Sequence, residues 1–142
     1  MPYVCPLCAL QPASHSLKNV AEKENVLYFY TCPAEATLYF DVDGIINHYN
    51  GVLSEIPSDR EWIWIFDSFE FSLKHALQFN VAIELAKLIS TKFSKNLKKV
   101  IIINPTIFIN FTYRLLQPFL NEKLLSVIDM NTEYKTINEV LA

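Results

Sequence analysis

The sequence predicts one α/β domain in which helices pack on a mostly parallel β-sheet. Short runs of β-branched and aromatic residues, at 26–32, 61–67 and 100–103, alternate with longer segments whose apolar residues recur at helical spacing. Strands that alternate with helices form parallel sheets, because each helix carries the chain back across the sheet. A length of 142 residues suits one such domain.

The two middle strands are expected to be buried on both faces of the sheet. Residues 61–67, EWIWIFD, form an almost continuous apolar run bounded by charges, and residues 100–103 are four consecutive β-branched residues. Residues 26–32 predict another strand, and 124–130, LLSVIDM, a fourth. A short last helix is expected from Thr132.

Two amphipathic helices are expected between the strands. The first covers 41–56, where Asp41 or Asp43 provides a candidate N-cap. The second covers 73–93, with Ser72 as its cap, and carries two apolar stripes. Such a helix is covered on more than one side.

The segment 108–121 is too apolar for an ordinary surface helix and contains Pro118, which removes a backbone donor and bends the segment. Two interpretations are open. The helix is either a kinked part of the core or the cover of a binding cavity.

Composition excludes several classes of function. A formal net charge of −3 gives no basic surface for nucleic acid, and with Gly44 and Gly51 as the only glycines there is no P-loop, no dinucleotide-binding fingerprint and no nucleophile elbow. No apolar run reaches the roughly 18–20 residues of a membrane span, and no signal peptide is evident. We therefore expect a cytoplasmic protein without a transmembrane segment.

Three cysteines are an odd number, which argues against a disulfide framework. Residues 1–24 are expected to be an N-terminal arm or a small zinc knuckle that precedes the domain at 25–142. Thiolates and imidazole are the ligands of structural zinc, and four such residues are available: Cys5, Cys8, His15 and Cys32. Free thiols in a flexible arm are the alternative.

Asp67 is expected at the carboxyl end of a central strand, where α/β folds bind ligands. It could act as an acid or base, or accept a hydrogen bond in an Asx turn that leads into the next helix. Asp41 and Asp43 are similarly either a metal pair or a helix cap. No nucleophile lies at a recognisable distance from His48 or His75, so catalysis is not expected of either.

Three segments together resemble one family. They are WIWIFDSFEFSL at 62–73, KFSKNLKKVIIINPTIFINFTYRLLQPFLNE at 92–122, and LLSVID at 124–129. In this order they resemble the CRAL-TRIO, or Sec14-like, lipid-binding domain. The resemblance implies a CRAL-TRIO/Sec14-like fold, in which Asn104 falls on the family's asparagine and 108–121 is the helix that gates the lipid cavity. The residues then expected to meet ligand are Trp64, Phe66, Ile102, Phe108, Phe111, Leu115, Leu116, Phe119 and Leu120.

The chain departs from the family pattern where phosphoinositide headgroups bind. Phe93 and Ser94 replace the expected Tyr-Pro, Lys95 replaces the glutamate that follows, and Val127 replaces a lysine. The family's N-terminal helical module and its usual ending are also absent from the sequence, so a shortened domain is expected.

The resemblance implies non-enzymatic binding of a hydrophobic ligand such as a lipid, with no cofactor apart from the candidate zinc. The alternative is a protein-interaction module of divergent CRAL-TRIO type, with a protein partner or a second copy bound to an exposed apolar patch. A third interpretation is a zinc-stabilised domain with enzymatic residues around Asp67.

Overall fold

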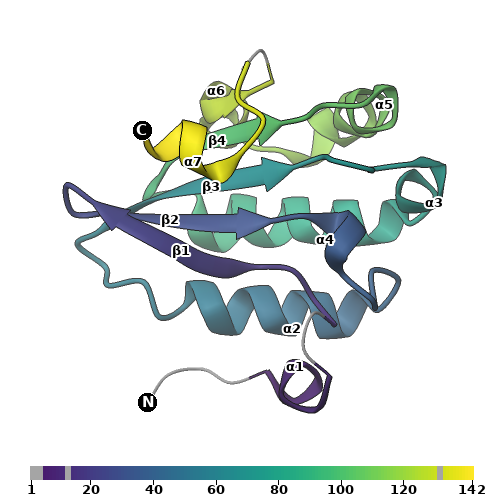
Figure 1. The fold of residues 1–142 in the computed structure, drawn as a ribbon, viewed down its shortest axis with the longest axis horizontal. Helices are drawn as coiled ribbons and strands as arrows, with labels where there is room; N and C mark the ends of the chain where they lie inside the picture. The colour runs from purple at the N-terminus through teal and green to yellow at the C-terminus, as the bar shows by residue number, and fades with distance from the viewer. Residues whose placement is uncertain (1–4, 12–13, 131–132) are drawn as a thin grey trace.

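The computed structural model describes residues 5–11, 14–130 and 133–142, and its centre is a five-stranded sheet with strand order β1-β2-β3-β4-β5 (Figure 1). The strands are β1 (Lys18–Lys23), β2 (Val26–Thr31), β3 (Glu61–Asp67), β4 (Leu97–Ile103) and β5 (Ile128–Asp129). β1 pairs with β2 in antiparallel orientation, and all other pairs are parallel. The predicted fold class, a mostly parallel sheet with helices on it, is confirmed.

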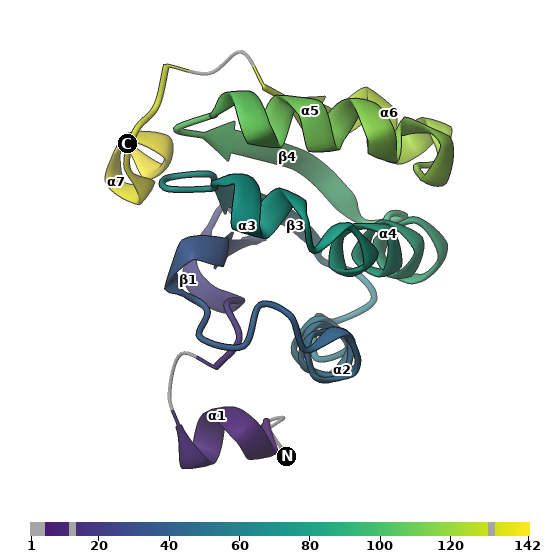
Figure 2. The same cartoon turned by 90° about the vertical axis from the view of Figure 1, so that its right-hand side faces the viewer.

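Most of the helices cover one face of the sheet. The helices are α1 (Pro6–Leu10), α2 (Val42–Leu53), α3 (Leu73–Ala76), α4 (Phe79–Leu88), α5 (Ile107–Leu116), α6 (Glu122–Val127) and α7 (Ile137–Leu141), with 3₁₀ turns at Pro33–Glu35 and Gln117–Phe119 and a π-helical turn at Ile89–Phe93. Figure 2 shows α2, α4, α5 and α6 on one side of the sheet and α7 on the other. Within the described residues, no helix is both long and apolar enough to cross a bilayer.

The central strands contribute to a core on each face, as their continuous apolar runs predict. Trp62 and Trp64 of β3 belong to the larger cluster beneath α2 and α4, so both side chains pack under helices. Ile63 and Ile65, which alternate with them, belong to a second cluster that Ile137 of α7 helps to cover. The period of two along a strand explains this division.

Several helix starts follow from side chains identified in the sequence. The Asp41 carboxylate accepts a hydrogen bond from the backbone N–H of Gly44 at 3.2 Å and caps α2. Ser72 precedes α3, and its backbone N–H donates to His75 Nδ1 at 3.0 Å. Asp41 and Ser72 are thus the caps that the sequence predicted. Of the two roles considered for Asp41 and Asp43, a metal pair or a helix cap, Asp41 has the role of the cap.

The segment 73–93, expected to be one helix, is divided into α3, α4 and the π-helical turn. The prediction of a strand over 124–130 is mostly wrong. Asn121 starts a helix there because its side-chain oxygen accepts a hydrogen bond from Leu124 N at 2.8 Å, so that only Ile128 and Asp129 remain as a strand. The last helix begins at Ile137, and its expected start at Thr132 lies outside the described residues.

Residues 1–24, expected to be an arm or knuckle that precedes the domain, include part of the sheet, because Lys18–Lys23 form the edge strand β1. Four of its six residues are exposed, and three are charged. Charged side chains are typical of edge strands, where they discourage pairing with other chains, but they remove the apolar signal by which a strand is recognised.

Candidate functional site

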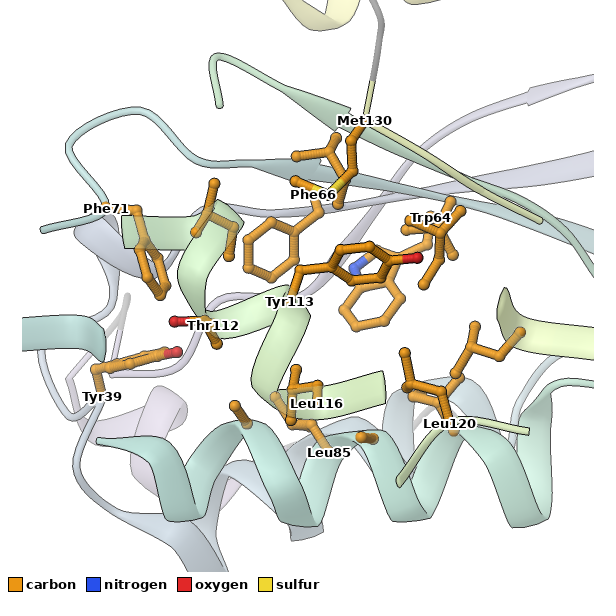
Figure 3. A pocket seen from close by; sticks show the side chains of 18 residues that line it. Tyr39, Trp64, Phe66, Phe71, Leu85, Thr112, Tyr113, Leu116, Leu120 and Met130 are labelled. Carbon is orange, nitrogen blue, oxygen red and sulfur yellow. The ribbon is translucent and has the colours of Figure 1, made fainter. Parts of the chain in front are cut away.

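The candidate site is an apolar cavity of about 100 Å³ between the sheet, α4 and α5 (Figure 3). The sheet provides its floor, α4 one wall, and α5 with the chain that follows it the cover. The lining residues are Tyr39, Trp64, Phe66, Phe71, Ala82, Leu85, Ala86, Ile89, Val100, Ile102, Ile109, Thr112, Tyr113, Leu116, Leu120, Leu124, Ile128 and Met130. Trp64, Phe66 and Ile102, which the resemblance placed at the ligand, are among them.

The cavity offers few polar groups to a ligand, and none of the described residues that line it carries a formal charge. Trp64 Nε1–H donates to Thr31 Oγ1 at 3.0 Å, and Thr112 Oγ1 donates to the Phe108 carbonyl at 2.9 Å. Burial raises the pKa of Tyr39 above its ordinary value, so its hydroxyl stays neutral. The lining therefore suits a ligand that is mainly hydrocarbon.

The orientation of α5 differs from the prediction. Of the six helix residues expected at the ligand, Leu116 and Leu120 line the cavity, whereas Phe108, Phe111, Leu115 and Phe119 do not. Phe111 is 59% exposed and Leu115 44% exposed on the outward face of the helix. For these four residues the expected position at the cavity is wrong.

The sequence did not single out Ile109, Thr112 and Tyr113, which occupy the inward face of α5. Figure 3 shows Tyr113 reaching from α5 toward Trp64. These residues lie at helical spacing with Leu116 and Leu120, so the periodicity was present in the sequence. It was overlooked because the outward face is the more apolar of the two.

The change of helix type at Gln117 agrees with the bend expected from Pro118. α5 ends at Leu116, and Gln117–Phe119 form a 3₁₀ turn with the proline in its first positions. Thr106 caps the other end of α5 and accepts a hydrogen bond from Ile109 N at 3.3 Å. The cavity cover is thus a short helix that begins at the Thr106 cap and ends at the 3₁₀ turn containing Pro118.

Asp67 forms the Asx turn that was one of its two predicted roles. Its Oδ1 accepts hydrogen bonds from Phe69 N at 2.9 Å and Asn104 Nδ2 at 3.0 Å, and its Oδ2 accepts one from the Tyr30 hydroxyl at 2.6 Å. Burial, together with this contact to Asp67, raises the pKa of Tyr30 well above its ordinary range. The carboxylate therefore links β2, β3 and the start of the segment after β4.

Three of the four predicted zinc ligands lie together. Single ligand atoms of Cys5, Cys8, His15 and His48 all lie within 4.8 Å of one another. Cys32 is not in this group: it follows β2, packs in the cluster on the other face of the sheet, and has its Sγ 3.9 Å from the Phe69 carbonyl oxygen. The prediction of Cys32 as the fourth member of the group is therefore wrong.

The comparisons with known proteins agree with this architecture. A sequence model of the CRAL/TRIO domain matches residues 4–141, whereas no curated protein sequence matches the chain. Among solved structures, the crystal structure of Sfh5 resembles it with a TM-score of 0.64 at 15% identity, over 85% of this chain and 47% of that chain. The protein thus spans about half the length of Sfh5, and at this identity the likeness shows the fold alone. Because the family match covers almost every residue, the chain belongs to the CRAL/TRIO domain family.

Proposed function

We propose that this protein binds a lipid-like molecule in the cavity beneath α5 and carries out no chemistry on it. The observation that carries the proposal is the lining, in which apolar side chains from β3, β4, α4 and α5 surround one space with no charged group among the described residues. Burying a hydrocarbon chain contributes about 0.8 kcal/mol per CH₂, so even a ten-carbon chain provides several kcal/mol. Membership in the CRAL/TRIO family supports the same ligand class.

The ligand enters by displacing α5. The cavity measures about 100 Å³, whereas pockets for drug-sized ligands measure roughly 300–1,000 Å³. Since α5 begins at a cap and ends at the turn that contains Pro118, it can move as a unit away from α4 and the sheet. This motion gives 108–121 the gating role that the family resemblance implies.

Binding is favoured over catalysis by the surroundings of Asp67. The carboxylate already accepts hydrogen bonds from three groups, so its oxygens are occupied by the fold and few of their lone pairs remain for a substrate. Within the part of the chain that the structure describes, the side chains that line the cavity also lack an acid or base with an ordinary pKa near neutral pH.

The experiment is a titration of the delipidated full chain with a fluorescent fatty-acyl probe. Ala86→Leu places three additional carbon atoms in the cavity lining and is expected to weaken probe binding at least about tenfold, or 1.4 kcal/mol. Ala21→Leu, in the edge strand β1, is the control and leaves binding unchanged. Equal affinities for the wild type and Ala86→Leu would place the probe elsewhere.

A second candidate, the protein-interaction module, is favoured by one observation. Apolar side chains with large exposed fractions lie on the outward face of α5 and in the turn that follows it: Ile107, Phe111, Leu115 and Phe119. Neighbouring α3 and the residue after it add Leu73 and Leu77. We name these six residues the outer patch. Exposed apolar clusters of this kind mark contacts with proteins or membranes.

Self-association distinguishes the second candidate most directly. If a second copy covers the outer patch, sedimentation at rising protein concentration will show a dimer that Phe111→Ser abolishes. If lipid binding is the function and the patch has no protein partner of this kind, the chain stays monomeric and Phe111→Ser leaves affinity for the acyl probe unchanged.

A further inference from the structure

Two thiols and two imidazoles converge between the N-terminal segment and α2, although His48 lies far from the others in sequence. Cys8 Sγ lies 3.8 Å from His15 Nδ1 and 3.9 Å from His48 Nδ1. Cys5 Sγ lies 3.5 Å from His15 Nδ1. None of these four residues lines the cavity beneath α5, so the group calls for a separate explanation.

These separations match a tetrahedral metal centre. Zinc bonds sulfur at about 2.3 Å and imidazole nitrogen at about 2.0–2.1 Å, which in a tetrahedron places sulfur and nitrogen about 3.5–3.6 Å apart. The three measured distances lie within a few tenths of an ångström of this value. We propose that Cys5, Cys8, His15 and His48 bind one structural zinc ion.

The outer nitrogens of both imidazoles support this assignment. His15 Nε2 lies 3.3 Å from Asp41 Oδ2, and His48 Nε2 lies 3.0 Å from the Leu17 carbonyl oxygen. Both partners can only accept, so Nε2 carries the hydrogen and Nδ1 presents its lone pair to the thiols. Metal-binding histidines show this same arrangement, in which an acceptor outside the site fixes the ring and its tautomer.

Gly44 provides the space that the His15–Asp41 contact requires. A Cβ at this position would overlap the Asp41 carboxylate and lie 2.9 Å from His15 Nε2. Gly44 lies in the first turn of α2, where alanine would be the better helix former by about 1 kcal/mol. Glycine at this position therefore lowers the intrinsic stability of α2 but leaves room for the contact between His15 and Asp41.

The ion would explain how α1 is held to the domain. α1 has five residues, none of them buried, and helices of this length are not stable by themselves. Figures 1 and 2 show α1 beside α2, away from the sheet. A zinc ion would join Cys5 and Cys8, at the start of α1 and within it, to α2 through His48. With four protein ligands it has no open position, so its role is structural.

The experiment measures zinc in the full chain, purified under reducing conditions without added metal, by native mass spectrometry and elemental analysis. We expect one zinc ion per chain, and cobalt(II) as a probe is expected to give the visible bands of a tetrahedral thiolate site. Cys8→Ser removes a ligand and abolishes stoichiometric zinc, whereas Cys32→Ser, a cysteine outside the cluster, retains it.

A second pair of variants keeps the test independent of folding. Asp41→Asn retains a good helix cap but removes the carboxylate next to His15, and is expected to lower zinc affinity about 10- to 100-fold. Asp43→Asn, on the exposed face of the same turn, leaves it unchanged.

Three results would overturn the proposal. The first is a chain that binds no zinc even when zinc is supplied to the reduced protein. The second is a Cys5–Cys8 disulfide as the stable form, seen as the loss of two hydrogens from the intact mass. The third is loss of zinc from Cys32→Ser to the same extent as from Cys8→Ser.

Discussion

Two adjacent leucines on α5 provide a matched test of which helix face meets the ligand. Leu116 lines the cavity, whereas Leu115 points outward and is 44% exposed. The same substitution by asparagine, which is similar in size but polar, therefore has different consequences at the two positions. In Leu116→Asn, a bound acyl chain covers the new amide and removes it from water.

The size of the expected loss of affinity in Leu116→Asn follows from the polar groups near the cavity. Trp64 Nε1 and Thr112 Oγ1 already have partners, so the amide at position 116 finds few new ones. Covering an amide without adequate hydrogen bonds costs about 1–3 kcal/mol in proteins. This corresponds to a loss of affinity of about 5- to 150-fold for Leu116→Asn and no loss for Leu115→Asn.

The assay is titration with the fluorescent acyl probe, at a temperature where circular dichroism shows both variants to be folded. Equal affinities for the two variants would refute the reasoning, as would a larger loss in Leu115→Asn. The latter result would mean that the outward face, which the sequence favoured, is the one that meets the ligand.

Three further predictions concern other parts of the molecule. Gly44→Ala is expected to lower zinc affinity at least about tenfold, because the added Cβ displaces the carboxylate next to His15; competition with a zinc chelator measures it. Burial lowers the pKa of His75 below 6.5, so the unfolded chain takes up the proton first and stability falls as the pH drops below 6.5; urea unfolding across this range should show a smaller decrease in His75→Gln. Asp67→Asn is expected to lower the free energy of unfolding by about 1–3 kcal/mol, because an amide cannot accept from Tyr30 and its other donors at once; urea unfolding at neutral pH measures the change.

Each of these predictions has a control in the chain. Gly51→Ala, at the chain's other glycine and also in α2, should retain zinc, and a loss equal to that in Gly44→Ala would contradict the steric argument. His75→Gln keeps a side-chain acceptor for the N–H of Ser72, so an unchanged pH dependence would show that His75 is not the group responsible. Asp59→Asn, at an exposed aspartate, should leave stability unchanged.

The sequence predicted the centre of the fold because the central strands are buried on both faces. The apolar runs at 61–67 and 100–103 are typical of buried strands and lie in β3 and β4, and Asp41 and Ser72 identified the starts of two helices. β1 was missed because an exposed edge strand has no apolar pattern to detect. Local signals thus predicted the interior and failed at the edge of the sheet.

The candidate sites could be predicted only in part, because side-chain environment depends on packing that the sequence pattern does not encode. On α5 the more apolar stripe faces outward, so hydrophobicity alone selected Phe111 and Leu115 over Thr112 and Tyr113. His48 joins the cysteines only because α2 packs beside the N-terminal segment. The sequence signal for His48 was its position as an ionisable residue on the buried face of the amphipathic helix α2.

The central claim, that the cavity beneath α5 holds a lipid-like molecule, is tested most directly by mass spectrometry of the full chain purified from cells. Under gentle conditions the account predicts a complex with a lipid-sized mass, which is lost on denaturation, can be identified after extraction, and is absent from Ala86→Leu. An empty chain in the wild type, or a lipid retained equally by Ala86→Leu, would contradict it.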